Sequence, residues 1–262
     1  MNVYDTEFYD LQVPRSTRSA KRIVPLVQNV YTFKSVVDLG CGSGAWLSIF
    51  RECGIDDVLG LDGDYVPPAA RRIPPELFRP TDLSRPFFVD RTFDLAMSLE
   101  VAEHLPESAA DRFVNTLATL APVVLFSAAI PFQGGTHHVN EQWQSYWAEK
   151  FARHGFVPVD FLRDEIWDDE SVEWWYTQNI LLYVNSSAIH NFAELERLRS
   201  RVPAPALDRV HPRLYLRRQD ALKTRWHPAR LFIAIRRRAQ NATHSVTRRL
   251  REALSRGKIS LG

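Results

Sequence analysis

The 262-residue sequence contains only two cysteines and no apolar run that approaches the length of a membrane span. Cys41 and Cys53 are too few for the disulfide framework of a small secreted protein, and they fit a reducing compartment. A phosphate loop ending in G-K-[ST] is absent, which argues against a nucleoside triphosphatase. The first seven residues lack the basic start and apolar core of a signal peptide. These absences predict a cytoplasmic protein.

The most informative motif that is present is a glycine-rich loop, D-L-G-C-G-S-G at residues 38–44, which follows a short apolar strand. Gly40, Gly42 and Gly44 allow a tight turn and a close approach to a ligand, which side chains would obstruct. Their spacing differs from that of the dinucleotide-binding pattern. A strand, such a loop and a helix in this order belong at the carboxyl edge of a parallel sheet, where open α/β sheets bind their ligands.

Acidic residues follow the next expected strands in a regular order. A second strand over 58–61 ends at Asp62, about where an acidic residue binds ribose hydroxyls in nucleotide-binding α/β folds. A further acid lies in Thr81–Leu83, and 93–99 reads as a fourth strand. Together with the glycine loop, these motifs resemble, over roughly residues 35–185, those of class I S-adenosylmethionine-dependent methyltransferases.

The resemblance implies S-adenosylmethionine as cofactor and a role for each motif. Asp62 would accept two ribose hydroxyls, as a carboxylate can. Asp82 would contact the adenine, and the fourth strand would border the methionine part. The implied cofactor-binding residues are Asp38, Gly40, Gly42, Gly44, Asp62, Gly63, Asp82, Leu83, Ser98 and Leu99.

The resemblance also implies an α/β architecture. We expect a three-layer Rossmann-like methyltransferase fold with a seven-stranded, mostly parallel sheet whose last strand is antiparallel, plus a basic helical C-terminal appendage. Pro158 favours an edge strand. Further expected elements are helices at 16–30 and about 143–154 and strands at 123–127, 156–159 and 179–184. The expected parts are an N-terminal helical cap (1–34), the cofactor-binding methyltransferase domain (35–187), a linker with a short helix (188–212) and a basic amphipathic tail (213–262).

The chemistry is expected just after the fourth strand, in E-V-A-E-H at residues 100–104. On a helical turn Glu100, Glu103 and His104 share one face, and two carboxylates with an imidazole suit Mg²⁺ or Mn²⁺. The arrangement resembles the metal site of ubiquinone-biosynthesis O-methyltransferases and of enzymes that methylate the terminal 2′-hydroxyl of small RNAs. Many class I enzymes instead carry E-H-L here without a metal, so both interpretations stay open.

A second cluster follows the fifth expected strand, in the loop P-F-Q-G-G-T-H-H-V-N-E-Q-W at residues 131–143. In an extended segment His137 and His138 would point to opposite sides, so that one could face the cofactor. The small-RNA enzymes place a metal-binding histidine in a comparable loop. The candidate catalytic residues are therefore His104, His137 and His138, and the candidate metal ligands are Glu100, Glu103, His104 and His137.

Aromatic residues crowd into W-W-Y-T-Q-N at residues 174–179. Aromatic faces stack on sugar rings or bases, and amides bind hydroxyls. The alternative is that the rings cover the core before the last strand. The candidate substrate residues are Trp174, Trp175, Tyr176, Gln178 and Asn179.

Charge is distributed unevenly along the chain. Residues 209–262 hold fifteen Lys or Arg against Asp220 and Glu252, a net charge of +13, which leaves −11 for residues 1–208. An apolar stripe at helical spacing between 231 and 253, flanked by arginines, predicts a basic amphipathic helix. Such a helix can lie on an anionic membrane at the inner face, contact nucleic-acid phosphates, or dock on the acidic body of its own chain or of a partner in a homodimer.

The combined pattern predicts an O-methyltransferase that acts on a sugar hydroxyl of a glycan or glycosylated small molecule, as in polysaccharide biosynthesis, with a divalent metal as an aid. Two alternatives remain. An RNA 2′-O-methyltransferase is favoured by the basic tail and weakened by the acidic body. A catalytically inactive cofactor-binding partner protein would keep the glycine loop without the chemistry.

Overall fold

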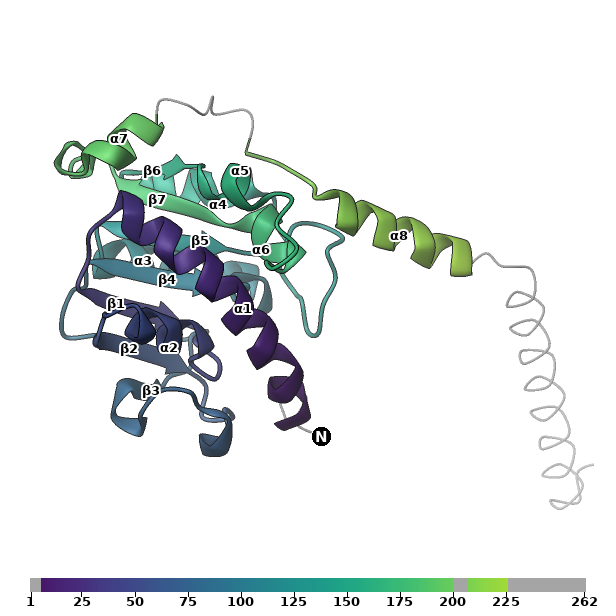
Figure 1. Cartoon of the computed structure of the whole chain (residues 1–262), viewed down its shortest axis with the longest axis horizontal. Coiled ribbons are helices and arrows are strands. Elements are labelled where there is room, and N and C mark those ends of the chain that lie inside the picture. The colour runs from purple at the N-terminus through teal and green to yellow at the C-terminus, as the bar shows by residue number, and fades with distance from the viewer. Residues whose placement is uncertain (1–5, 200–206, 226–262) are drawn as a thin grey trace, which may run out of the picture. The chain divides into compact units, whose positions relative to one another are not determined.

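A seven-stranded sheet lies between two layers of helices in the computed structural model, which describes residues 6–199 and 207–225 (Figure 1). The strand order is β3-β2-β1-β4-β5-β7-β6. Only β7 runs antiparallel to its neighbours β5 and β6 among these strands. The strands are β1 (Ser35–Leu39), β2 (Asp57–Asp62), β3 (Phe78–Pro80), β4 (Leu95–Leu99), β5 (Val123–Ser127), β6 (Phe156–Val159) and β7 (Leu181–Asn185).

This topology confirms the expected mostly parallel sheet with an antiparallel last strand. The edge position expected for Pro158 is also confirmed, because β6 ends the sheet and a residue without a backbone N–H is tolerated there. The order reverses direction at β1 and β4, so the loops after these two strands diverge. A ligand site is expected in the crevice that this reversal creates at the carboxyl ends of the strands.

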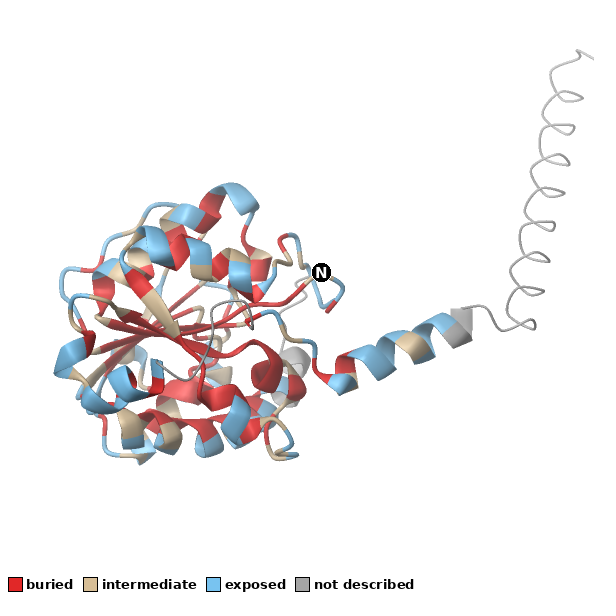
Figure 2. Ribbon diagram, turned by 90° about the horizontal axis from the view of Figure 1, so that it is seen from above, coloured by how far each residue is buried: buried red, intermediate tan, exposed pale blue. Residues whose placement is uncertain are grey.

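The central strands are apolar on both faces because helices cover both sides (Figure 2). Successive side chains of each strand point to opposite faces of the sheet, so they pack into different layers. Val36 and Leu125 belong to the core on one side of the sheet, whereas Val37 and Phe126 belong to the core on the other. The β strands are thereby specified by continuous apolar runs rather than by alternation with polar residues.

The helices divide between the two faces. Those that pack with the Val36 side are α1 (Thr6–Val30), α2 (Ala45–Glu52), α5 (Leu162–Ile166), α6 (Trp174–Asn179) and α7 (Ala193–Arg199). Those on the Val37 side are α3 (Ala110–Leu120) and α4 (Gln144–Arg153). Short 3-10 turns lie at η1 (Pro68–Ala70), η2 (Pro75–Leu77), η3 (Ala102–His104), η4 (Glu107–Ala109) and η5 (Ile189–Asn191).

Three expected elements begin at clearly different residues in the structure, and one of them is the strand expected over 93–99, which begins at Leu95. The N-terminal helix begins at Thr6 rather than Ser16, and passes through Pro14 and Pro25. The strand expected over 179–184 begins at Leu181, because residues 174–179 form α6. The aromatic segment is therefore a helix that packs its side chains inward, and the last strand starts only after it.

Residues 207–211 return to the body beside α4 and α5, and we call them the return segment. Arg163 donates a hydrogen bond of 2.7 Å to the carbonyl of Leu207, and the Gln144 side chain donates one of 3.1 Å to that of Arg209. The backbone N–H of His211 donates to Gln178 Oε1 at 2.9 Å. These bonds tie a segment that is distant in sequence to the interior of the domain.

The chain divides into two compact units, Met1–His211 and Pro212–Gly262. Of the second unit the structure describes α8 (Pro212–Arg225). The amphipathic helix expected between 231 and 253 lies outside the described residues, and so do the interpretations that depend on it. Within the described residues, no helix combines the length and apolar character that crossing a membrane requires.

Candidate active site

A cavity of about 840 Å³ opens at the carboxyl ends of β1, β2, β3 and β4. Its walls come from the ends of these strands and the loops after them, together with Gln12 of α1 and His137 of the loop after β5. The cavity brings together seven of the ten expected cofactor residues. Those on its wall are Gly40, Gly42, Asp62, Gly63, Asp82, Leu83 and Leu99.

The glycine loop turns in a way that only glycine permits at Gly40. Its φ is +91°, a region that side chains disfavour, and an added Cβ would lie 2.3 Å from Val101 Cγ2. The loop is held to β2, since the N–H of Gly40 donates to the Leu61 carbonyl at 2.7 Å and that of Gly42 to Asp62 Oδ2 at 2.6 Å. Gly44 instead packs on Ile73, so its role is in the core.

Two buried acids lie behind this loop. Burial, followed by the nearby Asp62, raises the pKa of Asp38 well above its usual value. Burial also raises the pKa of Asp62, although hydrogen bonds from Tyr65, Gly42 and Gly63 oppose that rise. Asp62 reaches the cavity wall, whereas Asp38 lies against a small hollow beside Ser43 and Trp46. The two expected acids are therefore adjacent, and Asp62 is the one open to the larger cavity.

Two further expected cofactor residues differ in position: Asp82 lies on the cavity wall, whereas Ser98 lies inside the sheet. The Asp82 carboxylate lines the cavity and accepts hydrogen bonds from the backbone and hydroxyl of Ser84. These bonds lower its pKa, led by the hydroxyl. Ser98 is fully buried and donates to the Leu39 carbonyl at 2.7 Å, which joins β4 to β1. Its side chain is thus occupied in holding the sheet together.

Glu100 is not on the turn that carries the other acidic and imidazole groups. It has a φ of 56° and precedes η3, so the helical spacing assumed from the sequence does not apply to it. Its carboxylate accepts 2.7 Å and 3.0 Å hydrogen bonds from the amides of Gln133 and Asn179. Gln178 extends the cluster, donating to Gln133 Oε1 at 3.0 Å. Burial raises the pKa of Glu100 to about 7, against these bonds.

Glu103, His104 and His138 offer ligand atoms that all lie within 4.8 Å of one another. We call these three residues the Glu-His-His group. The imidazoles of His104 and His138 meet edge to face, with ring centres 4.9 Å apart. Neither carboxylate oxygen of Glu103 makes a hydrogen bond of good geometry with any described residue, although both are buried. Burial, followed by Glu100, raises the pKa of Glu103 well above its usual value.

His104 is the most accessible member of this group to the cavity, whose wall it joins. Burial, followed by the charge of His138, lowers its pKa to about 4, so the imidazole is neutral at pH 7. Compared with the expected metal ligands, the group retains Glu103 and His104. Glu100 is bonded to two amides instead, and His137 lies on the cavity wall outside the group.

The loop over residues 131–143 is organised by Glu141, a residue outside the expected catalytic and metal-binding sets. Its carboxylate accepts hydrogen bonds from the N–H groups of Phe132 and Gly134 and lies 2.9 Å from Nδ1 of His138. A carboxylate behind an imidazole orients the ring for binding or catalysis. The acid three residues after His138 is the sequence signal that distinguishes it from His137, whose φ is 57°.

The expected substrate residues lie on α6, largely inside the protein. Trp174, Tyr176, Gln178 and Asn179 are buried, and the Tyr176 hydroxyl contacts Ser16 and the Trp46 indole, each at 3.3 Å. This differs from the expectation that they form an aromatic surface for a sugar ring. The Asn179 amide instead donates to Glu100, the Gln178 amide donates to Gln133 and Asn179, and the Tyr176 ring packs under α1, in agreement with the alternative that the rings cover the core.

Because the pKa values of Glu100 and Glu103 are raised in the folded state, these two groups make the free energy of unfolding fall as the pH rises. Between the ordinary value of 4.5 and the raised value, the folded state binds more protons at Glu100 and Glu103 than the unfolded state does. The contribution of Glu100 is fully present below pH 4.5 and is lost as the pH rises through about 7, and the contribution of Glu103 is lost in the same direction as the pH rises. We expect Glu103→Gln to gain on the order of 1–3 kcal/mol over wild type between pH 5 and pH 8 in urea denaturation with a chelator.

The matched control for this prediction is Glu107→Gln, which makes the same change at an exposed position of η4. Its free energy of unfolding should follow that of the wild type at every pH. If the free energies of unfolding of wild type and Glu103→Gln change in parallel with pH, burial does not raise the pKa of the Glu103 carboxyl.

Comparisons with known proteins come from sequence and from structure. Residues 14–168 match a family described as methyltransferase domain, whereas no curated protein matches the chain. A chain of the complex between the Haloferax volcanii Trm112 methyltransferase activator and a methyltransferase is 18% identical, with a TM-score of 0.51 over 69% of this chain and 94% of that chain. This likeness is one of fold.

Two other solved structures give similar values. The methyltransferase domain of bacterial CtHen1 is 20% identical, with a TM-score of 0.48 over 64% of this chain and 98% of that chain. CalS10, an amino pentose methyltransferase from Micromonospora echinaspora solved with S-adenosylmethionine, is 14% identical, with a TM-score of 0.49 over 71% of this chain and 99% of that chain.

Proposed function

The chain belongs to the family of methyltransferase domains, and from this premise we propose that it transfers the methyl group of S-adenosylmethionine to a sugar hydroxyl of a glycan or glycosylated small molecule. The expected Rossmann-like methyltransferase fold is confirmed. The observation that carries the proposal is the Glu-His-His group, which lies beside the cavity formed by the glycine loop and Asp62.

The residues around the cavity fit S-adenosylmethionine. The Gly40 position has no room for a Cβ, and the Asp62 carboxylate suits vicinal ribose hydroxyls. When bound, this cofactor supplies a methyl group that a sulfonium charge already activates. The protein must then align the acceptor oxygen with that methyl group and remove the proton of the acceptor.

The Glu-His-His group fits a divalent cation, because the buried Glu103 oxygens make no hydrogen bond of good geometry with a described residue, His104 is neutral and Glu141 orients His138. When bound, Mg²⁺ or Mn²⁺ supplies Lewis acidity that lowers the pKa of a hydroxyl. His137 lies on the cavity wall outside the group and is left to accept the proton. Without the cation, His137 or His138 would be the base, and amines and phenols would be more suitable acceptors.

A vicinal diol of a sugar suits this arrangement, since one oxygen can bind while its neighbour reacts. The cavity wall carries Asp62, Asp64, Asp82 and Glu100 against Arg85, which disfavours a polyanionic acceptor such as RNA. The net charge of −11 over residues 1–208 acts in the same direction. We therefore place the RNA 2′-hydroxyl second among acceptors.

A methyl-transfer assay tests the proposed function. Protein with methyl-labelled S-adenosylmethionine and Mn²⁺ would be offered glycosides with vicinal diols, the corresponding deoxy glycosides, and short single-stranded RNA. We expect label only in the diols. Label only in RNA would support the 2′-O-methyltransferase, and label in none, with S-adenosylhomocysteine bound, would favour the inactive partner protein.

We expect calorimetry to detect Mn²⁺ binding to protein saturated with S-adenosylhomocysteine. Glu103→Gln should weaken this binding about 100-fold or more, since losing even a supporting residue of a metal site costs about 10–100-fold. Glu107→Gln is the control and should leave the affinity unchanged. Equal affinities in all three proteins would exclude Glu103 as a ligand.

A further inference from the structure

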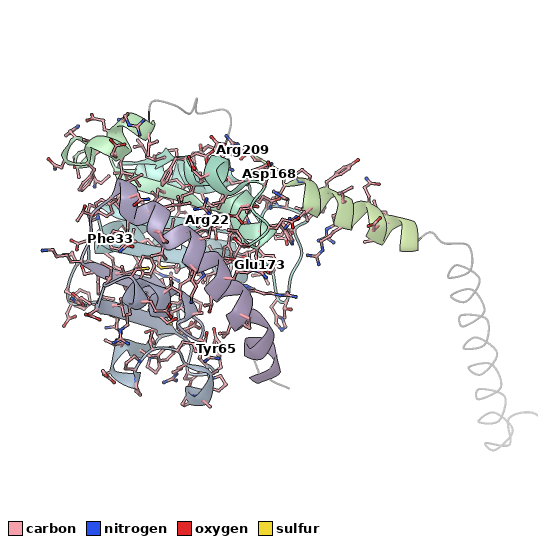
Figure 3. All side chains as sticks on the ribbon, in the orientation of Figure 1. Arg22, Phe33, Tyr65, Asp168, Glu173 and Arg209 are labelled. Carbon is pink, nitrogen blue, oxygen red and sulfur yellow. The ribbon has the colours of Figure 1, made fainter. Side chains whose placement is uncertain are left out.

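Asp62 already has three hydrogen-bond donors around its carboxylate. Oδ2 accepts the N–H of Gly42 at 2.6 Å, and Oδ1 accepts the N–H of Gly63 and the hydroxyl of Tyr65, each at 2.6 Å. Tyr65 follows β2 at the edge of the cavity and is labelled in Figure 3. The residue proposed to bind the cofactor ribose is thus largely occupied by the protein itself.

The acceptor capacity of a carboxylate sets a limit on this site. Its two oxygens offer about four acceptor positions. Two ribose hydroxyls in addition to the three present donors would need five. The N–H groups of Gly42 and Gly63 are fixed by the backbone that forms the cavity wall, so neither can leave without rebuilding the loop. The Tyr65 hydroxyl is the donor that can leave.

Tyr65 is placed so that it can move. Its side chain is 43% exposed, and its ring lies over Gly63, where an added Cβ would come within 2.0 Å of the ring. The ring therefore covers the backbone beside the ribose-binding carboxylate. Because one side of the ring faces solvent, rotation away from Asp62 requires no opening of the core.

We propose that Tyr65 is a residue that sets cofactor affinity by competing for Asp62: its hydroxyl occupies an acceptor position that a ribose hydroxyl takes on binding. This proposal rests on the proposed use of S-adenosylmethionine. A ligand with two ribose hydroxyls must displace Tyr65, whereas a ligand with one fits within the four positions and leaves Tyr65 in place. Tyr65 thereby lowers the preference for ribose over deoxyribose and hastens release of the product.

The test is calorimetry of S-adenosylhomocysteine and of its 2′-deoxyribose analogue with wild type, Tyr65→Phe and Tyr215→Phe. Phenylalanine removes the competing hydroxyl and retains the ring. We expect Tyr65→Phe to bind S-adenosylhomocysteine about 3- to 10-fold more tightly, the equivalent of one net hydrogen bond, and the deoxy analogue unchanged. Tyr215→Phe makes the same change at an exposed site on α8 and should bind both ligands as wild type does.

Weaker or unchanged binding of S-adenosylhomocysteine by Tyr65→Phe would overturn the proposal, since the hydroxyl would then help the ligand or play no part. Equal tightening for both ligands would overturn it as well, because competition for acceptor positions affects only the ligand with two hydroxyls. Failure of the wild type to bind S-adenosylhomocysteine at all would instead reject the proposed function on which the inference rests.

Discussion

Replacing Asp62 with alanine is expected to weaken binding of S-adenosylhomocysteine about 100-fold or more. Two hydrogen bonds to a charged carboxylate would be lost, each contributing about 1.5–3 kcal/mol. The same change frees the N–H of Gly42, which Asp62 Oδ2 holds at 2.6 Å, so the glycine loop loses its link to the end of β2. Isothermal titration calorimetry measures the affinity directly and needs no acceptor.

The control is Asp64→Ala, two residues further on, where an exposed carboxylate also lies on the cavity wall. It removes the same charge and should change the affinity less than threefold, since an exposed carboxylate is screened by water and ions more than the buried Asp62 is. Thermal melting of both variants shows whether each is folded. Equal losses of affinity at the two positions would mean that overall charge, rather than a contact at Asp62, governs cofactor binding.

Replacing Arg163 with methionine is expected to lower the free energy of unfolding by about 3–5 kcal/mol, the range for breaking a buried ion pair. Arg163 and Asp160 are both buried and paired through two hydrogen bonds, one of them of 2.8 Å. The variant leaves Asp160 in the interior with Arg209, labelled in Figure 3, 3.4 Å away. Arg163 also donates to the carbonyls of Gln178 and Leu207, and both would lose this donor, although the Gln178 carbonyl keeps the Gln144 amide at 3.2 Å.

An exposed pair with the same spacing provides the control for this prediction. Arg197 and Glu194 on α7 also lie three residues apart, but each side chain is 51% exposed. Arg197→Met should cost less than about 1 kcal/mol in urea denaturation, because exposed ion pairs contribute little. If the two methionine variants unfold at the same urea concentration, the Asp160–Arg163 pair does not hold the domain together.

The local parts of the fold could be predicted from the sequence. Val36–Leu39, Val123–Ser127 and Phe156–Val159 are apolar runs bounded by turn residues, and they form strands at the expected positions. The aromatic segment at 174–179 was harder, because its residues suit a strand, a helix or a surface equally well. Residues 174–179 form a buried helix because they pack beneath α1, where Tyr176 contacts Ser16 and Trp46.

The members of the candidate site were predicted more accurately than their arrangement. Residue types and order located the glycine loop, Asp62, Glu103 and His104. Glu141 follows His138 by three residues in the sequence, but the contact that selects His138 over His137 also depends on two backbone N–H groups that donate to the Glu103 carbonyl, and these follow only from the fold of the loop. Glu100 was grouped with the metal ligands because a regular helix was assumed, whereas its φ of 56° places it before the turn.

The return segment has a consequence for where the chain can be shortened. The methyltransferase match ends at residue 168, and α7 ends at Arg199, so either position looks like a natural boundary for expressing the domain alone. A chain cut at residue 168 would lose β7 from within the sheet, and one cut after Arg199 would leave the buried side chains of Arg163, Gln144 and Gln178 without the carbonyl and N–H groups of Leu207, Arg209 and His211. A fragment meant to fold should therefore extend through His211, and protease sites placed before Leu207 should divide the domain rather than trim it.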